Sequence, residues 1–251
     1  GCPEGTTVEV RDIFFNVPSR RKFLRSTSTE TGHVNEHFTR LALAYPDVAF
    51  AMSSNGRSTY NLPPTETHLP RIAKLYGSEL SEALLPVERD ERGLRIHAYL
   101  APPVHSRAAA QWQYVYVNGR FVRDRFVQHA IREAYRGLME PNRHGVVFLF
   151  LYIDPSRVDV NVHPTKIEVR WADSNLIHSQ VLSALRETLQ RADLTPALRV
   201  QRPSAAPIDE AEQDRIRHEL GAILKSTTPI QGGAGAWPGA MPGQGNPQMP
   251  W

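Results

Sequence analysis

The stretch GVVFLFLYIDP, residues 145–155, predicts the strand around which the fold is arranged. Its apolar residues run from Val146 to Ile153 without a polar break, over the length of a strand. A strand that is apolar on both faces is typical of the centre of a sheet. We therefore expect residues 145–155 to form a central strand.

The segments on either side of this run predict the rest of the sheet and its helices. Residues 84–103 have a strand–turn–strand pattern, and residues 113–124 form a hairpin that Asn118-Gly119 can turn. Apolar residues at helical spacing predict helices at 68–77, 125–138 and 174–191. This order predicts an α+β fold of two layers, in which helices cover one face of a mostly antiparallel sheet.

The segment VDVNVHPTKIEVRW, residues 158–171, predicts two short strand runs joined at a rigid bend. Valines alternate with polar residues before Pro164, which cannot donate a ladder hydrogen bond. The alternation resumes after the bend, so Lys166 is expected at a strand entry with its side chain exposed. A solvated lysine in a turn is the simpler interpretation of the pattern.

Residues 1–64 show a separate pattern. Residues 5–18 begin as a strand and end in a loop, residues 19–26 are a short basic helix or turn, and residues 29–45 have helical spacing. Residues 47–64 predict a hairpin turned at Asn55-Gly56. Pro63 and Pro64 mark a boundary after this part.

Composition limits the classes of protein that fit. Hydrophobic residues make up 41% of the 251 residues and charged residues 22%, as in a globular protein with one or two domains. One cysteine excludes a disulfide framework and a zinc site of the paired-cysteine kind. No apolar run is long enough to cross a membrane. Residues 226–251 are rich in proline and glycine and carry no charge, which is typical of a flexible linker, and a short helix is expected at 208–224.

Arginines concentrate in one part of the chain, although the net charge is only +3. Residues 107–136 hold six arginines against two acids, a local excess of +4. Arginine offers forked donors that match phosphate oxygens. We therefore expect DNA binding by Arg120, Arg123, Arg125, Arg132 and Arg136, the last three sharing a helix face with His129. A merely solvated basic face explains the pattern equally well.

The histidines suggest a metal site only weakly. His33 and His37 are four residues apart on a predicted helix, and His163 and His178 lie elsewhere. No further ligand is near them in sequence, and the motif lacks the glutamate placement of a helical zinc site. We expect no metal site here.

Three motifs together resemble the MutL family of DNA mismatch repair proteins. They are GTTVEVRDIFFNVPSRRKFL (5–24), YVYVNGRFVRDRFVQHAIREAY (114–135) and VDVNVHPTKIEVRW (158–171). Their order and spacing match that family over roughly residues 1–200. The resemblance implies that residues 1–64 are the C-terminal part of an ATPase domain of the type found in gyrase and histidine kinases. It implies a transducer domain of ribosomal-protein-like fold at 65–200 and the start of a linker at 201–251.

The resemblance also implies site residues. Gly5 and Thr6 match a Gly-Thr motif that binds ATP, and Lys166 matches the lysine that reaches the γ-phosphate, which gives it a catalytic role. Arg120, Arg123 and Arg125 match basic residues of the family's DNA groove. ATP and Mg²⁺ are the implied cofactors. The family's water-activating glutamate, its Mg²⁺-binding asparagine and its glycine-rich lid have no counterpart here, so we expect no ATP hydrolysis by this chain alone.

The partners implied are DNA of any sequence, a mismatch-recognition protein, a downstream nuclease or helicase, and a second copy of the parent protein. The implied location is the bacterial cytoplasm, with association to the nucleoid during repair. Two alternatives remain from the residues themselves. One is a stand-alone nucleic-acid-binding module without enzymatic activity, and the other is a protein-interaction domain whose basic face meets an acidic partner.

Overall fold

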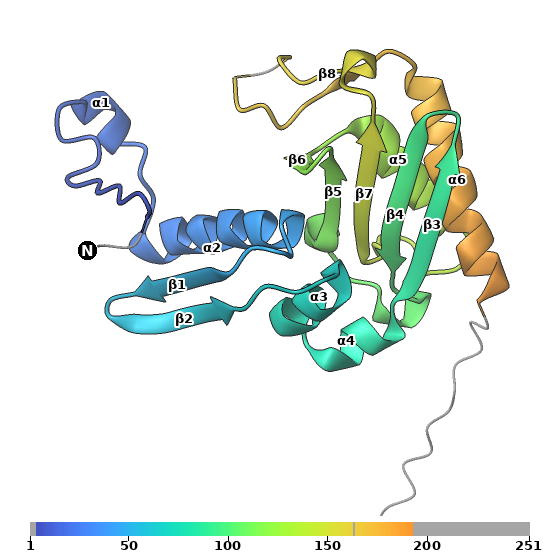
Figure 1. Cartoon of the computed structure of the whole chain (residues 1–251), viewed down its shortest axis with the longest axis horizontal. Coiled ribbons are helices and arrows are strands. Elements are labelled where there is room, and N and C mark those ends of the chain that lie inside the picture. The colour runs from blue at the N-terminus through green and yellow to red at the C-terminus, as the bar shows by residue number, and fades with distance from the viewer. Residues whose placement is uncertain (1–3, 163, 193–251) are drawn as a thin grey trace, which may run out of the picture. The chain divides into compact units, whose positions relative to one another are not determined.

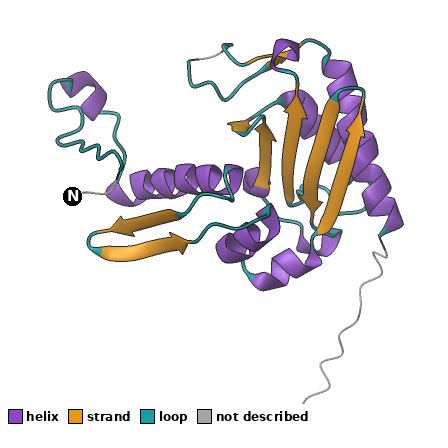
Figure 2. Ribbon diagram, in the orientation of Figure 1, coloured by secondary structure: helices purple, strands orange, loops and turns teal. Residues whose placement is uncertain are grey.

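The computed structural model describes residues 4–162 and 164–192, and Figures 1 and 2 show how their helices and strands are arranged. The predicted linker at 201–251, with its helix at 208–224, lies outside the described residues. Every element treated below belongs to one compact unit, Gly1–Pro196.

A five-stranded sheet lies at the centre of this unit. Its strands are β3 (Leu85–Glu91), β4 (Leu94–Leu100), β5 (Gln113–Val117), β6 (Arg120–Val122) and β7 (Val147–Ile153), in the spatial order β3-β4-β7-β5-β6. All neighbouring strands are antiparallel except β5 and β7, which are parallel. The predicted mostly antiparallel sheet and the central position of residues 147–153 are confirmed.

The two faces of the sheet bury different side chains because strand residues alternate between faces. In β7, Val147, Leu149 and Leu151 join an aliphatic core, whereas Phe148 and Phe150 join an aromatic one. The aliphatic core is completed by α5 (Arg125–Ala134) and α6 (Ser174–Arg191). The aromatic core is completed by residues from the C-terminal end of α2 (Thr27–Ala44), from α3 (His68–Tyr76) and from α4 (Ser78–Ala83). The α+β class is confirmed, and the sheet has a helical cover on this second face as well.

The elements of residues 18–62 follow the predicted pattern. They are α1 (Pro18–Arg21), α2, and the hairpin of β1 (Phe50–Ser54) and β2 (Arg57–Leu62). Asn55 and Gly56 have φ angles of 52° and 75°, the left-handed conformation that a tight hairpin turn requires. The remaining short elements are η1 (Pro103–His105), η2 (Ala110–Trp112), η3 (Pro155–Arg157), β8 (Val158–Asp159) and β9 (Arg170–Trp171).

Two polar side chains hold connections of the fold in place. Asn118, in the β5–β6 turn, donates to the carbonyl of Ile153 at 2.8 Å and accepts from its N–H at 3.0 Å. Arg71 is fully buried and donates to the carbonyls of Pro46, Val48 and Pro63 at 2.7–3.0 Å. These bonds cross the boundary expected after residue 64 and join α3 to the hairpin connections.

Three local predictions were wrong. Residues 5–17 contain no strand, since none of the described residues pairs with them, and Val8 and Val10 are 81% and 74% exposed. Within 158–171 only β8 and β9 are strands, because a turn at Pro164-Thr165 and a φ of 54° at Lys166 interrupt the extended backbone. Helix α5 ends at Ala134, so Leu138 is 40% exposed rather than part of the buried stripe.

Candidate nucleic-acid interface

The start of α5 fixes the position of two predicted DNA-binding arginines. The Asp124 carboxylate accepts hydrogen bonds from the N–H groups of Phe126 and Val127, both at 3.0 Å, and so caps the helix. Arg125 is the first helical residue. The N–H of Arg123 donates to the carbonyl of Ile167 at 2.8 Å, which joins the β6–α5 connection to the segment that follows Pro164.

A cavity of about 500 Å³ lies beside this helix start. Arg123, Arg125 and Arg170 contribute its positive charge, and Asp124 and Glu168 its negative charge. Three arginines against two carboxylates leave the cavity a local excess of one positive charge. Phe126, Trp171 and Ser174 complete the polar and aromatic parts of its lining.

Trp171 lines this cavity and also carries a buried hydrogen-bond donor. Its side chain is 7% exposed, and its indole N–H is buried without an acceptor among residues 4–162 and 164–192. A buried donor left unpaired is costly, so such a group often marks a place where a ligand or water is bound. A donor of this kind beside three guanidinium groups favours an anionic ligand.

The structure divides the predicted arginine stripe into free and paired members. In the part of the chain that the structure describes, no ion pair is formed by Arg120, Arg123, Arg125 or Arg132, all of which are exposed. Arg136 lies beyond the end of α5 and pairs with Glu133 at 3.1 Å. Arg132 lines a different cavity, with Arg143 and His144. The structure therefore brings Arg123 and Arg125 together and separates them from Arg132 and Arg136.

His129, predicted to share the exposed face of α5, is bonded to the neighbouring helix. Its Nδ1 lies 2.9 Å from Nε2 of His178 on α6; His129 is exposed and His178 is partly buried. One ring nitrogen must donate and the other accept, so the two imidazoles link the helices that cover the aliphatic core. Among the described residues there is no group of three or more His, Cys, Asp or Glu that could hold a metal ion.

The predicted ATP-binding residues lie in exposed, irregular segments. Lys166 is exposed just after the turn at Pro164-Thr165, one residue before the Ile167 carbonyl that accepts from Arg123. Lys166 forms no ion pair with any residue that the structure describes. Gly5 and Thr6 are exposed, and a Cβ at Gly5 would meet no atom within 4 Å.

Sequence reasoning did not assign Arg170 and Trp171 to the site. Both belong to the segment 158–171, and the strand alternation there places Arg170 on the exposed side. Their position beside Arg123 depends on the hydrogen bond from Arg123 to Ile167, which joins residues far apart in sequence. The sequence signal that could have indicated this site was the pair Arg170-Trp171 at the end of a strand with one polar face.

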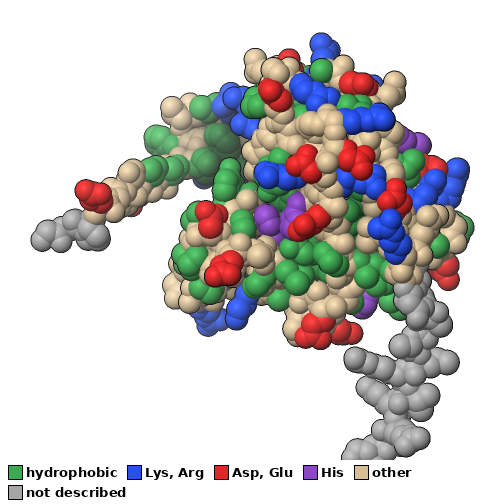
Figure 3. All heavy atoms as spheres, turned by 45° about the vertical axis from the view of Figure 1, so that its right-hand side comes forward, with side chains coloured by type: hydrophobic (Ala, Val, Ile, Leu, Met, Phe, Trp, Pro, Cys, Tyr) green, Lys and Arg blue, Asp and Glu red, His purple; other side chains and the backbone are tan. Residues whose placement is uncertain are grey.

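Charge elsewhere on the surface is mixed. On the face that Figure 3 presents, basic and acidic side chains are interspersed. Arg89 on β3, for example, pairs with Glu187 on α6 at 2.6 Å, and such pairs reduce the free positive charge. In the described parts of the chain, no helix has the length and hydropathy needed to cross a membrane.

Comparison with known proteins defines the class to which this fold belongs. Residues 72–190 match the family described as "DNA mismatch repair protein, C-terminal domain", which includes the five-stranded sheet, α5 and most of α6. A solved structure described as the N-terminal domain of a DNA repair protein superposes with a TM-score of 0.61 at 19% identity. That superposition covers 72% of this chain and 60% of the other.

Within that class the relatives agree on one family. The chain is 46% identical over 192 residues to the DNA mismatch repair protein MutL of Syntrophotalea carbinolica, covering 76% of this chain and 31% of the relative. It is 44% identical over 250 residues to MutL of Azotobacter vinelandii, covering 96% of this chain and 39% of the relative. The chain belongs to the MutL family of DNA mismatch repair proteins. It spans about a third of the length of these curated relatives.

Proposed function

We propose that this chain binds the phosphate backbone of duplex DNA through the cavity at the start of α5, as part of a mismatch repair protein. The observation that carries the proposal is the meeting of Arg123, Arg125 and Arg170 in the lining of one cavity, beside Trp171. Arginine forks and N–H donors match phosphate oxygens, which are the same at every base pair. Binding is therefore largely independent of sequence.

The free arginines are expected to contribute more to DNA binding than the arginine that forms an ion pair. A guanidinium without a carboxylate partner keeps its donors for phosphate, whereas Arg136 must first leave Glu133. Arg123 and Arg125 therefore contribute most, and Arg120 extends the contact along the adjoining hairpin. Arg132 and Arg136 contribute less, which refines the expectation of one continuous stripe.

We further propose that Lys166 links this surface to a bound nucleotide. Its exposed ammonium, free of ion pairs among the described residues, fits the γ-phosphate of ATP, and Gly5 and Thr6 offer accessible backbone to the same nucleotide. Mg²⁺ would accompany ATP and neutralise its phosphates. Because the Ile167 carbonyl accepts from Arg123, a movement of Lys166 towards ATP would shift the arginine cavity.

For the whole protein we propose the role of an ATP-dependent coordinator in the bacterial cytoplasm. It would act as a homodimer between a mismatch-recognition protein and a downstream nuclease or helicase. The support is membership of the MutL family. Within that role, residues 1–64 would form the end of an ATPase domain and residues 65–200 a transducer domain, and a linker would begin at residue 201.

The DNA proposal is tested by duplex binding at several salt concentrations. Arg125→Glu should weaken binding to every sequence by about tenfold or more, because it replaces attraction by repulsion next to a phosphate. The slope of log affinity against log salt should fall by about one for each phosphate contact that is lost. Fluorescence anisotropy with two duplexes of unrelated sequence measures both quantities.

Arg57→Glu is the matched control. Arg57 is exposed on the β1–β2 hairpin, so the substitution makes the same change of charge without touching the cavity. If both variants lose affinity to the same extent, net charge alone governs binding. If Arg125→Glu keeps the affinity and salt slope of the unmodified chain, the cavity does not bind DNA.

A further inference from the structure

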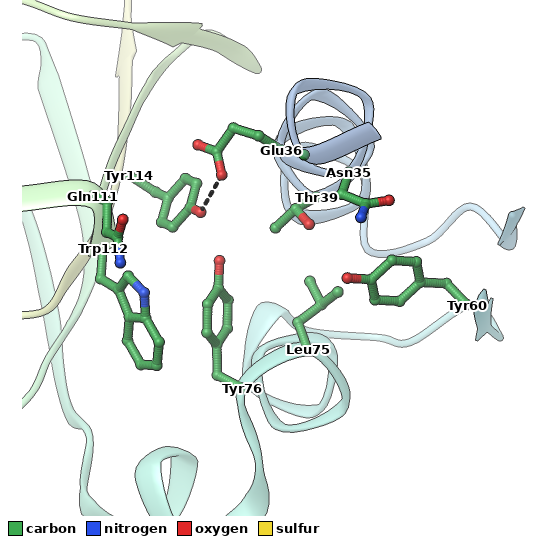
Figure 4. A pocket seen from close by; sticks show the side chains of 10 residues that line it. Asn35, Glu36, Thr39, Tyr60, Leu75, Tyr76, Gln111, Trp112 and Tyr114 are labelled. Carbon is green, nitrogen blue, oxygen red and sulfur yellow. Dashed lines mark hydrogen bonds between the residues drawn. The ribbon is translucent and has the colours of Figure 1, made fainter. Parts of the chain in front are cut away.

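A second cavity, on the opposite face of the sheet, has no part in the proposed DNA surface. It measures about 250 Å³ and lies between α2, α3, β2 and the start of β5. Figure 4 shows that aromatic side chains surround it, with Tyr76 pointing upward from α3, Tyr60 entering from β2, and Trp112 and Tyr114 on the side of the sheet. None of its lining residues lines the arginine cavity.

The aromatic walls are uncharged at neutral pH. Burial raises the pKa of Tyr76 far above its ordinary value, and burial together with nearby Glu36 raises the pKa of Tyr114 to about 12. Both hydroxyls therefore keep their protons and can donate hydrogen bonds. The rings offer π-faces and edges, and their hydroxyls give the cavity a polar interior.

Two polar atoms in this cavity are shielded from solvent and have no partner. They are the side-chain oxygen of Asn35 and the hydroxyl of Tyr76, which lies near the Tyr114 hydroxyl but forms no hydrogen bond of good geometry among the residues that the structure describes. The two atoms come from different helices, α2 and α3, that face each other across the cavity (Figure 4). A ligand that satisfies both must carry a hydrogen-bond donor for Asn35 and a group that pairs with a hydroxyl.

The charge of the cavity is balanced, which excludes a preference for ions. Glu36 contributes the single carboxylate, and one of its oxygens pairs with Arg40, at 2.9 Å from Nη2 and 3.1 Å from Nε. The other oxygen accepts from the Tyr114 hydroxyl at 3.3 Å, a long hydrogen bond. An added cation would meet a carboxylate that is already neutralised, so a neutral ligand fits better.

We propose that this cavity binds a nucleobase. A base is neutral and planar, carries donors and acceptors on its edge, and stacks on aromatic side chains. Cavities for drug-sized ligands occupy about 300–1,000 Å³, so the smaller volume here suits one ring system rather than a whole nucleotide. Arg107 lies over the Trp112 ring, 4.6 Å from its centroid, where it can contact a phosphate attached to the base.

Two sources of the base are possible, and two binding experiments distinguish them. The first probe is 2-aminopurine riboside, whose fluorescence decreases when the base stacks on an aromatic ring. The second is a single-stranded oligonucleotide with one 2-aminopurine, compared with the same strand lacking a base at that position. Quenching of the free riboside identifies a free base or nucleoside as the ligand. Tighter binding of the oligonucleotide than of the strand lacking the base, without quenching of the free riboside, identifies an unstacked base within a strand.

Substitutions in the lining should weaken this binding without harming the fold. Tyr76→Phe removes only the unpaired hydroxyl and should lower affinity about two- to tenfold. Because that hydroxyl is buried without a partner, the thermal midpoint should stay the same or rise. Tyr45→Phe removes the hydroxyl of a half-exposed tyrosine outside the cavity and should leave affinity unchanged.

Gly32 allows a steric test. It lines the cavity from α2, and a Cβ built there would meet no atom within 4 Å. Gly32→Leu should fill part of the cavity and lower affinity more than Tyr76→Phe does, while Gly32→Ala should have a smaller effect. The site is independent of the arginine surface, so Arg125→Glu should not change quenching of the free riboside.

Several results would overturn the proposal. Absence of quenching in both probes would do so, and so would equal binding by the strand with and without the base. Unchanged affinity in both Tyr76→Phe and Gly32→Leu would show that the base binds elsewhere. Displacement of a bound probe by methylguanidinium, but not by unlabelled nucleosides, would identify a site for cations instead.

Discussion

The two faces of the central sheet are built from the same strands but carry different cores and different cavities. In β7, Val147, Leu149 and Leu151 pack under α5 and α6 in an aliphatic core. The arginine cavity lies on this side, at the start of α5. Phe148 and Phe150, on the other face, form an aromatic core with α2, α3 and α4. This aromatic core borders the small polar cavity. The first face offers exposed charge, and the second offers shape and buried hydrogen-bonding groups.

This difference determines how each face should respond to substitution. Exposed charges contribute little to folding, so the arginines can be changed at small cost in stability. Buried polar groups contribute much, since removal of one partner leaves the others unpaired in a region without water. Function on the arginine side should therefore be separable from stability, whereas on the aromatic side this holds only for groups outside the buried hydrogen-bond network, such as the Tyr76 hydroxyl.

The largest contrast is expected between two arginines. Arg71→Met should destabilise the fold by about 3–5 kcal/mol, because three buried carbonyls lose their common donor. Arg125→Met should change the free energy of unfolding by no more than about 0.5 kcal/mol. Urea unfolding followed by circular dichroism measures both. Similar losses for the two variants would remove the distinction between the faces.

The second effect is a dependence of stability on pH that arises on the aromatic side. Burial and nearby His97 lower the pKa of His68 from 6.5 to about 4, and its ring lies 3.8 Å from that of Phe150. The unfolded chain binds this proton more readily than the folded one, so stability should fall as pH decreases from about 6.5 towards about 4. His68→Phe keeps the ring contact and should flatten this dependence.

The control for His68→Phe is His33→Phe, because His33 is exposed on α2. Urea midpoints between pH 7 and pH 4.5 should decline less in His68→Phe than in the unmodified chain, and should decline normally in His33→Phe. Part of the decline will remain in His68→Phe, since burial also lowers the pKa of His97. An unaltered decline in His68→Phe would mean that other groups determine the acid sensitivity.

A smaller and opposite effect is expected from Gly32→Ala. Gly32 lies inside α2, where glycine is about 1 kcal/mol less favourable than alanine, and the added methyl group meets no atom within 4 Å. The free energy of unfolding should therefore rise by about 1 kcal/mol. Thermal and urea unfolding should agree on this increase. A decrease would show that the aromatic cavity tolerates no added volume at its rim.

Local patterns in the sequence predicted much of this fold. Asn55-Gly56 and Asn118-Gly119 marked their hairpins because a tight turn needs positive φ angles, and the unbroken apolar run at 146–153 marked the central strand. The failures came where long-range pairing decides the structure. Residues 5–17 have strand composition but no partner strand within 4–162 and 164–192, and the turn at Pro164-Thr165 outweighs the alternation around it.

The site was predicted in part for the same reason. Arginines that are close in sequence, Arg123 and Arg125, do lie together, since one helix start holds them both. Arg136 was placed on the same face by helical spacing, but α5 ends before it. Arg170 and Trp171 reach the cavity through contacts between distant segments, and the aromatic cavity draws on α2, β2, α3 and β5. Periodicity within one element does not contain such information.

The smallest expected effect is that of Trp171→Phe, which tests whether DNA binding on the arginine side depends on a buried group. Trp171→Phe keeps an aromatic ring in the cavity lining and removes the indole N–H, which has no acceptor among the described residues. If a DNA phosphate accepts from that N–H, affinity for duplex DNA should fall by about 1 kcal/mol, roughly fivefold. Stability should also fall, because Trp171 packs in the aliphatic core and the smaller ring leaves a cavity there, so affinity is compared under conditions where both chains stay folded. Since an indole N–H carries no net charge, the salt dependence of binding should keep its slope.

That last expectation separates Trp171 from its neighbours. Arg125→Glu should change both affinity and salt slope, whereas Trp171→Phe should change affinity alone, and anisotropy titrations at several salt concentrations resolve the two patterns. A loss of stability without a loss of affinity would assign Trp171 to the aliphatic core, where it also packs. The arginine side would then act through surface charge only. A loss of affinity in a variant that remains folded would show that a buried donor contributes to DNA binding on this side, as buried polar groups are proposed to bind a base on the other.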